Sequence, residues 1–146
     1  MDKTQVDRWL DAYVTAWKSN DRDLIGALFA EDVSYRYHPY DEPVVGRAAV
    51  VGAWLGESEH PGASTVDAPG TFDAVYRAVA VDGDVAVATG SSIYLTEPGG
   101  AIDEVFDNCF VLRFDEAGRC REFTEWYIRR PREMLALITP LLGDGH

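Results

Sequence analysis

The spacing Trp9-x-x-x-Tyr13-x-x-x-Trp17 decides the fold of this chain, together with the Asn20-Asp21 and Leu28-Phe29-Ala30-Glu31-Asp32 segments that follow it. Aromatic rings at i, i+4 and i+8 form one stripe along a helix face. Such a stripe packs a core, and Trp9 is expected to do only that. A tyrosine-rich strand that ends in histidine and a Gly-Arg helix start come next. Together these features predict a small fold with an internal cavity.

Length and charge restrict the classes of protein that this chain can belong to. Its 146 residues, 47% hydrophobic and 12% aromatic, fit one well-packed domain over 1–146 and argue against disorder. The formal net charge of −12 repels phosphate backbones and anionic headgroups, so we expect no nucleic-acid partner and no membrane partner. No apolar run approaches the ~20 residues of a membrane span and no signal-peptide pattern opens the chain, so a cytoplasmic location is expected.

Hydrophobic periodicity predicts helices first and a long antiparallel meander afterwards. The apolar period changes from 3.6 to 2 after a Gly/Ser/Pro-rich loop, which we expect to form a lid or rim. This order indicates an α+β fold in which a curved antiparallel sheet wraps on the N-terminal helices, with the cavity between the layers. The expected elements are helices 4–19 (N-cap Thr4), 22–30 and 47–56, strands 33–37, 71–81, 85–95, 102–114 and 120–129, loop 57–70, and a terminal helix or arm over 132–142.

The sequence carries no signature of a disulfide, a metal site or a cofactor. Cys109 and Cys120 fall on neighbouring strands but out of register, and neither belongs to a Cys-x-x-Cys pair. No nucleotide-binding motif such as Gly-x-Gly-x-x-Gly occurs. We therefore expect two free thiols, no metal and no cofactor.

The pairing of the last two expected strands predicts which side chains face the cavity. If the turn over 115–118 pairs Phe114 with Arg119, facing residue numbers sum to 233. The facing pairs are then Phe106 with Tyr127, Asn108 with Glu125, and Phe110 with Phe123. This is the more apolar face of the hairpin and hence the inner one. Burial of Glu125 without a cationic partner would raise its pKa and let it act as a general acid or base.

Several segments of the chain resemble the SnoaL-like, nuclear transport factor 2-like superfamily, which includes ketosteroid isomerases and polyketide cyclases. The matching segments are Ala12-Tyr13 through Asn20-Asp21, residues 28–33, Gly46-Arg47, and residues 110–119, so the resemblance covers nearly the whole chain. It implies a cone of curved sheet and helices with one deep pocket, a cone-shaped α+β barrel that often dimerises through its sheet.

The resemblance to ketosteroid isomerases also implies roles for individual residues. Tyr13 falls at their oxyanion tyrosine, and Trp54 at the second tyrosine that supports it. Their aspartate base falls at Tyr37 or His38, and at His38 if the following proline is matched to Pro39. Their protonated aspartate falls at Phe110, which cannot donate a hydrogen bond. The Asp-Arg-Asp set of the epoxide-hydrolase branch has no clear match.

These arguments give a set of candidate site residues. The expected catalytic residues are His38, Tyr13, Glu125 and Asn108, and the expected pocket wall is Trp17, Tyr35, Tyr37, Trp54, Phe106, Phe110, Phe123 and Tyr127. Each has a structural alternative: His38 as a cap of its turn, Tyr13 as core packing, and Glu125 as the partner of Arg36 or Arg121. Arg47 is expected to serve the start of its helix.

The function hypothesis is binding of a small, mostly apolar, cyclic molecule by a homodimer. Acid–base chemistry on that molecule (isomerisation, cyclisation, hydration or dehydration) is one form of the hypothesis. The alternative is a non-catalytic ligand-binding or dimerisation module, because one fold can serve both roles. A pocket sealed by an ion pair of Glu125 favours the module, and an open pocket favours the enzyme.

Overall fold

A computed structural model describes residues 1–57 and 66–137 of the chain. The helices are α1 (Lys3–Ser19), α2 (Arg22–Ala27) and α3 (Arg47–Trp54), and a 3-10 helix, η1 (Arg132–Leu137), follows the last strand. The strands are β1 (Phe29–Arg36), β2 (Val44–Val45), β3 (Phe72–Asp82), β4 (Val85–Leu95), β5 (Ile102–Phe114) and β6 (Cys120–Arg129). Helices come first and a β-meander follows, which confirms the expected α+β class.

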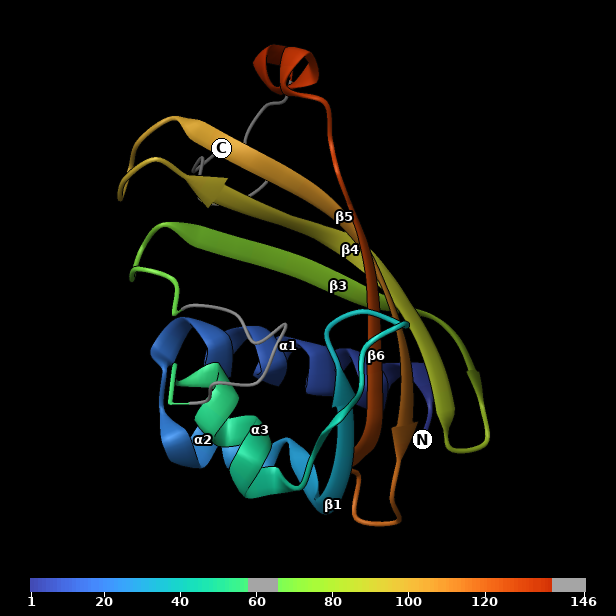
Figure 1. Ribbon diagram of the computed structural model, residues 1–146. Coiled ribbons are helices and arrows are strands. Elements are labelled where there is room, and N and C mark those ends of the chain that lie inside the picture. Colours follow the sequence, from blue (N-terminus) through green and yellow to red (C-terminus); the bar gives the residue numbers. More distant parts are fainter. Residues whose placement is uncertain (58–65, 138–146) are drawn as a thin grey trace.

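All six strands form one open, curved sheet in the order β2-β1-β6-β5-β4-β3. The three α-helices lie in its hollow, and η1 stands away from them (Figure 1). We expected a purely antiparallel sheet, but the sheet is mixed. Strands β1 and β6 run parallel, with Phe29 beside Cys120 and Arg36 beside Thr124. The sequence-adjacent strands β3 to β6 pair through tight turns, whereas β1 and β6 meet only after the whole meander has returned.

Helix α1 begins one residue before its expected start because a different residue caps it. Asp2 accepts a hydrogen bond from the Gln5 amide (2.8 Å) and its own amide donates to the Gln5 side chain (2.9 Å), which forms a capping box. The expected cap, Thr4, lies inside the helix. The helix ends at Asn20, whose left-handed backbone (φ 53°) turns the chain toward α2.

The aromatic stripe of α1 divides between core and cavity. Trp9 is 7% exposed, and its indole N–H donates to the Leu28 carbonyl oxygen at 3.0 Å, so it ties α1 to the end of α2. Tyr13 stacks on Phe123 of β6, with ring centroids 5.6 Å apart. Trp17, one turn further, packs on Phe72 at 4.4 Å. Such pairs add about 0.5–1.5 kcal/mol each beyond the buried area.

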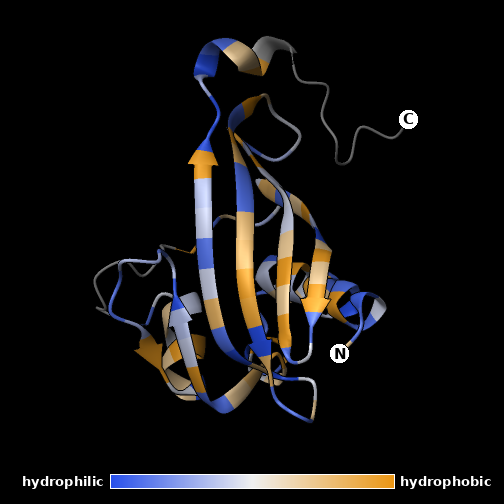
Figure 2. Cartoon of the chain, turned by 90° about the vertical axis from the view of Figure 1, so that its right-hand side faces the viewer, coloured by the Kyte–Doolittle hydropathy of each residue, from blue (hydrophilic) through white to orange (hydrophobic). Residues whose placement is uncertain are grey.

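The register of the β5–β6 hairpin differs from the expected one by two residues. Asn108 lies opposite Tyr127 and Phe110 opposite Glu125, so facing numbers sum to 235. A register shift between Arg113 and Phe114, next to the turn, causes the difference. A shift of two keeps each side chain on its face, which is why the inner face is still the expected one. Figure 2 shows the alternation of hydrophobic and hydrophilic residues along the strands.

Smaller differences concern element boundaries. Strand β1 begins at Phe29, four residues before the expected start, and shortens α2, while α3 stops at Trp54. Both cysteines are free, as expected. Residues 58–65 of the expected loop and 138–142 of the expected terminal helix or arm lie outside the described residues. None of the described helices is long and apolar enough to cross a membrane, and the cytoplasmic location stays a prediction.

Gly90 is the position in β4 at which the sheet tolerates no side chain. A Cβ there would stand 2.0 Å from the Val75 carbonyl oxygen and 2.8 Å from the Cα of Tyr76. We expect Gly90→Ala to lower the free energy of unfolding by about 2 kcal/mol or more, because backbone must move to admit the methyl group. Urea denaturation followed by circular dichroism measures this change.

Gly52→Ala is the matched control for that substitution. Gly52 lies inside α3, where the nearest atoms to an added Cβ, on Glu57, are 4.0 Å away. Gly52→Ala should raise the free energy of unfolding by up to about 1 kcal/mol, because alanine is the better helix former. Equal stability of Gly90→Ala and the parent would contradict the close approach of β3 to β4.

Candidate functional site

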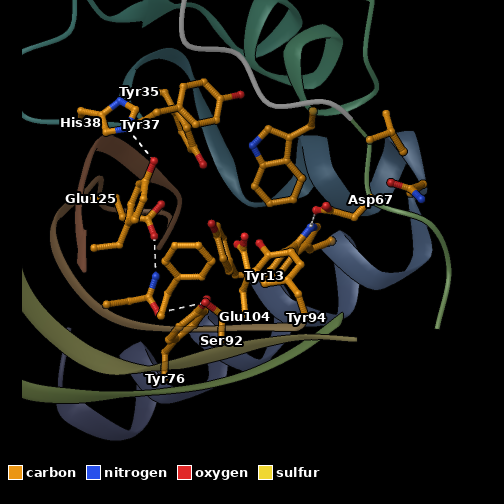
Figure 3. Close-up of a pocket in the computed structure, with 17 residues that line it drawn as sticks. Tyr13, Tyr35, Tyr37, His38, Asp67, Tyr76, Ser92, Tyr94, Glu104 and Glu125 are labelled. Atoms are coloured by element: carbon orange, nitrogen blue, oxygen red, sulfur yellow. Dashed lines mark hydrogen bonds between the residues drawn. The ribbon is translucent and has the colours of Figure 1, made fainter. Parts of the chain in front are cut away.

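A cavity of about 400 Å³ lies between the concave face of the sheet and the helices. Figure 3 shows 17 lining residues, drawn from α1, α3, the strands and the segment before β3. The structure brings ten of the twelve expected site residues to this cavity: Tyr13, Trp17, Tyr35, Tyr37, His38, Trp54, Phe106, Asn108, Glu125 and Tyr127. The cavity reaches the surface at Tyr127 and Val66, which are 42% and 45% exposed.

Phe110 and Phe123 are the two expected wall residues that do not line the cavity. They are 0% and 1% exposed and belong to the hydrophobic core. Their rings lie against that of Tyr13, with centroids 6.0 and 5.6 Å away, so they form the layer behind the wall. Tyr13 therefore both packs the core and borders the cavity, so the two interpretations of this residue from the sequence apply together.

Three polar side chains form a hydrogen-bonded row across β4, β5 and β6. The Ser92 hydroxyl donates to Asn108 Oδ1 (3.1 Å), and Asn108 Nδ2 donates to Glu125 Oε2 (2.8 Å). Asn108 and Glu125 are diagonal neighbours in the observed register, which a long side chain can still span. Figure 3 shows this row as dashed lines at one side of the cavity.

The Glu125 carboxyl group is surrounded by protein atoms although its side chain reaches the cavity. Burial raises its pKa from 4.5 to about 7, because the charged form loses its hydration, and the hydrogen bond from Asn108 lowers the pKa by less. Neither expected competitor pairs with it: Arg36 donates to the Asp41 carbonyl oxygen, and Arg121 lies 3.8 Å from Asp84. Among the described residues, no salt bridge to Glu125 is present.

His38 lies at the mouth of the cavity between Asp41 and Tyr127. Its Nδ1 is 2.8 Å from Asp41 Oδ2, and its Nε2 is 2.7 Å from the Tyr127 hydroxyl oxygen. Because a carboxylate only accepts, Nδ1 is the donor to Asp41, and Nε2 is the ring atom that contacts the Tyr127 hydroxyl. The His38 amide also donates to Asp41 Oδ2 (3.1 Å), so the Asp41 side chain caps this turn, and His38 takes part in the turn while its ring lines the cavity.

Three tyrosine hydroxyls of the wall, those of Tyr13, Tyr35 and Tyr76, stay protonated near neutral pH. Burial raises the pKa of Tyr13 and of Tyr35 well above 10, and the charge of Glu125 adds to both shifts. The pKa of Tyr76 is raised by burial and then by Glu125. These groups can therefore donate hydrogen bonds to a ligand at any pH near neutrality.

A second carboxyl group enters from the segment before β3. Asp67 Oδ2 accepts a hydrogen bond from the indole N–H of Trp17 at 3.1 Å, and burial raises the pKa of Asp67. This segment belongs to the expected lid or rim, and Val66 and Asp67 are its described residues that line the cavity.

Sequence reasoning missed Asp41 and seven lining residues. Asp41 had a local signal, because an aspartate three residues after His38 can accept a hydrogen bond from the His38 amide and so close a turn. Tyr76, Ser92 and Tyr94 share their strands' inner faces, but only the register of β3 and β4 brings them to the cavity. The remaining missed residues are Asn20, Val66, Asp67 and Glu104.

Within residues 1–57 and 66–137, no group of three or more His, Cys, Asp or Glu side chains could hold a metal ion. The lining residues also give no phosphate-binding arrangement of glycines or basic side chains. The side chains present can transfer protons, at Glu125 and His38, and can form hydrogen bonds, at the tyrosines.

Glu125→Gln should make the protein more stable above neutral pH and leave it nearly unchanged in acid. A carboxyl group with a raised folded-state pKa disfavours folding once ionised, so its effect is absent below about 4.5, grows as pH rises to about 7, and is constant above. The full difference corresponds to roughly 3 kcal/mol. Urea denaturation at several pH values measures it, with Glu31→Gln, an exposed carboxyl on β1, as control. A difference in the free energy of unfolding between Glu125→Gln and the parent that does not depend on pH would contradict the desolvation of Glu125.

Comparisons with known proteins agree with this fold. The model of the family described as "SnoaL-like domain" matches residues 10–123. The structure is similar to that of an LEH-like epoxide hydrolase from M. tuberculosis, with a TM-score of 0.58 and 16% identity over 86% of this chain and 84% of that one. At this identity the likeness shows the fold alone, a nuclear transport factor 2-like α+β fold. No curated protein matches the chain. Since the family model covers well over half of the residues, the chain belongs to the SnoaL-like domain family.

Proposed function

We propose that this protein binds a small, mostly apolar, cyclic molecule in its cavity and acts on it by acid–base chemistry. The observation that carries the proposal is the Glu125 carboxyl group, which lies in an aromatic wall, is held by Asn108 and has a pKa of about 7. A carboxyl with that pKa is present in both protonation states near neutral pH, as a general acid or base requires. The reaction class is isomerisation, cyclisation, hydration or dehydration.

The other polar groups have complementary roles in this proposal. Tyr13 donates a hydrogen bond to an oxygen atom of the substrate, since its hydroxyl stays protonated. His38, held by Asp41, positions the Tyr127 hydroxyl at the mouth of the cavity through a hydrogen bond. Asn108 keeps one oxygen of Glu125 occupied and leaves the other for the substrate.

Two reactions known from the superfamily fit the site less well. Steroid isomerisation with a protonated aspartate would need a donor where Phe110 stands, and Phe110 lies in the core behind the wall. The Asp-Arg-Asp set of epoxide hydrolases needs an arginine, and the described lining residues include none. The similarity to an epoxide hydrolase therefore does not extend to a proposal of that activity.

A non-catalytic ligand-binding module is the second candidate, and the turn of His38 favours it. His38 and Asp41 join the two ends of that turn by backbone and side-chain hydrogen bonds, which gives His38 a structural role without chemistry. The argument against this candidate is that Glu125 has no ion pair among the described residues and a pKa of about 7, which suits proton transfer.

A general-base probe distinguishes the two candidates. Nitrobenzisoxazole is a flat bicycle in which loss of the ring C–H proton to a base breaks the N–O bond and gives a coloured cyano-nitrophenolate. We expect the protein to catalyse this elimination, with kcat/KM rising with pH to a plateau and a midpoint near 7, because only ionised Glu125 accepts the proton. The increase in absorbance of the phenolate product over time measures the rate.

Glu125→Gln should lower that kcat/KM by about 100-fold or more, while Glu31→Gln, which removes the same charge from the exterior, should not. His38→Ala should leave the midpoint of the pH profile of kcat/KM unchanged. Catalysis no better in the parent than in Glu125→Gln would favour the non-catalytic module.

We also propose that a second copy of the chain covers the outer face of the sheet. Val75 on β3, Val111 on β5, and Trp126 and Ile128 on β6 are 41%, 37%, 43% and 75% exposed, which is a large apolar content for one face of a sheet in water. The expected homodimer thus has a candidate surface, which the ion pair of Asp107 with Arg130 borders.

Light scattering on a sizing column tests this assembly. The parent should elute as a dimer, and Ile128→Glu should elute as a monomer with an unchanged circular dichroism spectrum, because a charge would be buried unpaired in the interface. A monomeric parent would contradict the proposal.

A further inference from the structure

The carboxylates of the described cavity lining are not matched by lysine or arginine in that lining. The described lining contains three carboxyl groups, those of Asp67, Glu104 and Glu125, and no lysine or arginine. The sequence of the two stretches outside the described residues, 58–65 and 138–146, contains no lysine or arginine either. His38 is therefore the single basic side chain of the described lining, and its Nδ1 is held by a carboxylate.

The rest of the described wall is mostly aromatic. Nine of the 17 lining residues are Phe, Tyr or Trp, including Trp17 and Trp54. The face of an aromatic ring carries negative potential and attracts a cation, with Trp giving the strongest effect. An aromatic wall interrupted by carboxyl groups is the surface that recognises organic ammonium ions.

The three carboxyl groups act on a common space. Each of them, Asp67 first, then Glu125 and Glu104, adds to the raised pKa of Tyr94 after burial, so the Tyr94 hydroxyl lies within electrostatic reach of all three. Figure 3 shows these side chains around the cavity.

Among the described residues, two of the three carboxyl groups have no cationic side chain paired with them. Asp67 accepts from the Trp17 indole and Glu125 from the Asn108 amide, both neutral donors. Only Glu104 has a cationic partner, Arg129, at 3.6 Å and largely in solvent. Desolvated carboxyl groups without a counter-ion are stabilised by any cation that enters.

We propose that the ligand of this cavity is an organic cation, an ammonium group on a cyclic apolar body, held by the aromatic wall and by Glu125 and Asp67. This inference rests on the proposed function, because it names the substrate class of the same cavity. The ammonium group lies between the carboxylates, and the ring of the ligand packs on the aromatic side chains. Carboxylate or phosphate ligands are excluded, because burying them beside like charges is strongly unfavourable.

The inference predicts a direction for the pH dependence of binding. Cation affinity rises with pH as Glu125 ionises and levels off above its pKa of about 7. Five tyrosines face Glu125 and keep their protons over this range because their pKa values are raised: Tyr13 from α1, Tyr35 from β1, Tyr76 from β3, Tyr94 from β4 and Tyr127 from β6. The other titratable groups of the described lining are Asp67, Glu104 and His38.

Three probes of equal shape and different charge test the inference. They are phenols that carry at the meta position a trimethylammonium group (cation), a tert-butyl group (neutral) or a sulfonate group (anion). Calorimetric titration at pH 8 should give a Kd for the cation at least about tenfold below that of the neutral probe, and no binding of the anion.

Two isosteric variants and one control locate the effect. Glu125→Gln and Asp67→Asn should each reduce the ratio of neutral to cation Kd by severalfold. Glu31→Gln removes the same charge from an exposed position on β1 and should leave the ratio as in the parent. This control separates recognition in the cavity from the overall field of an acidic protein.

Equal affinities for the cation and the neutral probe would overturn the inference and leave the proposed acid–base function intact. Tighter binding of the anion, or no binding of either other probe at millimolar concentration, would also overturn it. Catalysis of the nitrobenzisoxazole elimination is a separate readout, because that probe is neutral. Loss of the elimination with retained cation selectivity would contradict only the catalytic proposal.

Discussion

The structure depends on a mismatch between the length of its strands and the length of its helices. Strand β5 has 13 residues and spans roughly 43 Å, whereas α1, with 17 residues, spans roughly 25 Å. One helix layer therefore covers only part of the concave face. Where it covers the face, β5 and β6 present Leu112, Phe110 and Phe123, all buried. Beyond that, the same strands present Asn108, Glu125 and Tyr127, and the space between them is the cavity.

Aromatic rings fit the boundary between these two regions because they are large and can carry a polar end. Tyr35 lies flat on Phe123, with ring centroids 4.2 Å apart and planes within 3°. That contact joins β1 to β6 where they run parallel, so the packing that closes the core also fixes the wall of the cavity. The hydroxyl ends of such rings remain directed to the cavity, since burial without a hydrogen-bonding partner or solvent is unfavourable.

Much of the fold was predictable from the sequence because it follows local periodicity. The α1 stripe, the change of period after residue 70 and the three tight turns of the meander are all local signals, and the elements they indicate are present. Strand β1 begins earlier than its own residues indicate because Phe29 pairs with Cys120, a contact between residues far apart in the chain. No local pattern announces such a pairing, and the parallel contact of β1 with β6 could not be predicted for the same reason.

The part of the site that was predictable is the part set by the alternation of side chains between the two faces of each strand. The hairpin register was wrong by two, yet Asn108 and Glu125 still form a hydrogen bond, because both remained on the inner face and lie on a diagonal. Asp67 lies in a segment without periodicity, and only the folded path of the chain brings its carboxyl group to the Trp17 indole. Side chains of this kind are placed by tertiary structure, which a pattern of residues does not contain.

The row from Ser92 through Asn108 to Glu125 also gives the cavity a handedness. Asn108 accepts from Ser92 and donates to Glu125, so the amide is held in one orientation and the carboxyl group is held in one wall, on β6. A flat ring that lies along the aromatic side chains turns only one of its two faces toward that wall. A proton removed or delivered there would always leave or arrive from the same side, and a new stereocentre would form with a single configuration.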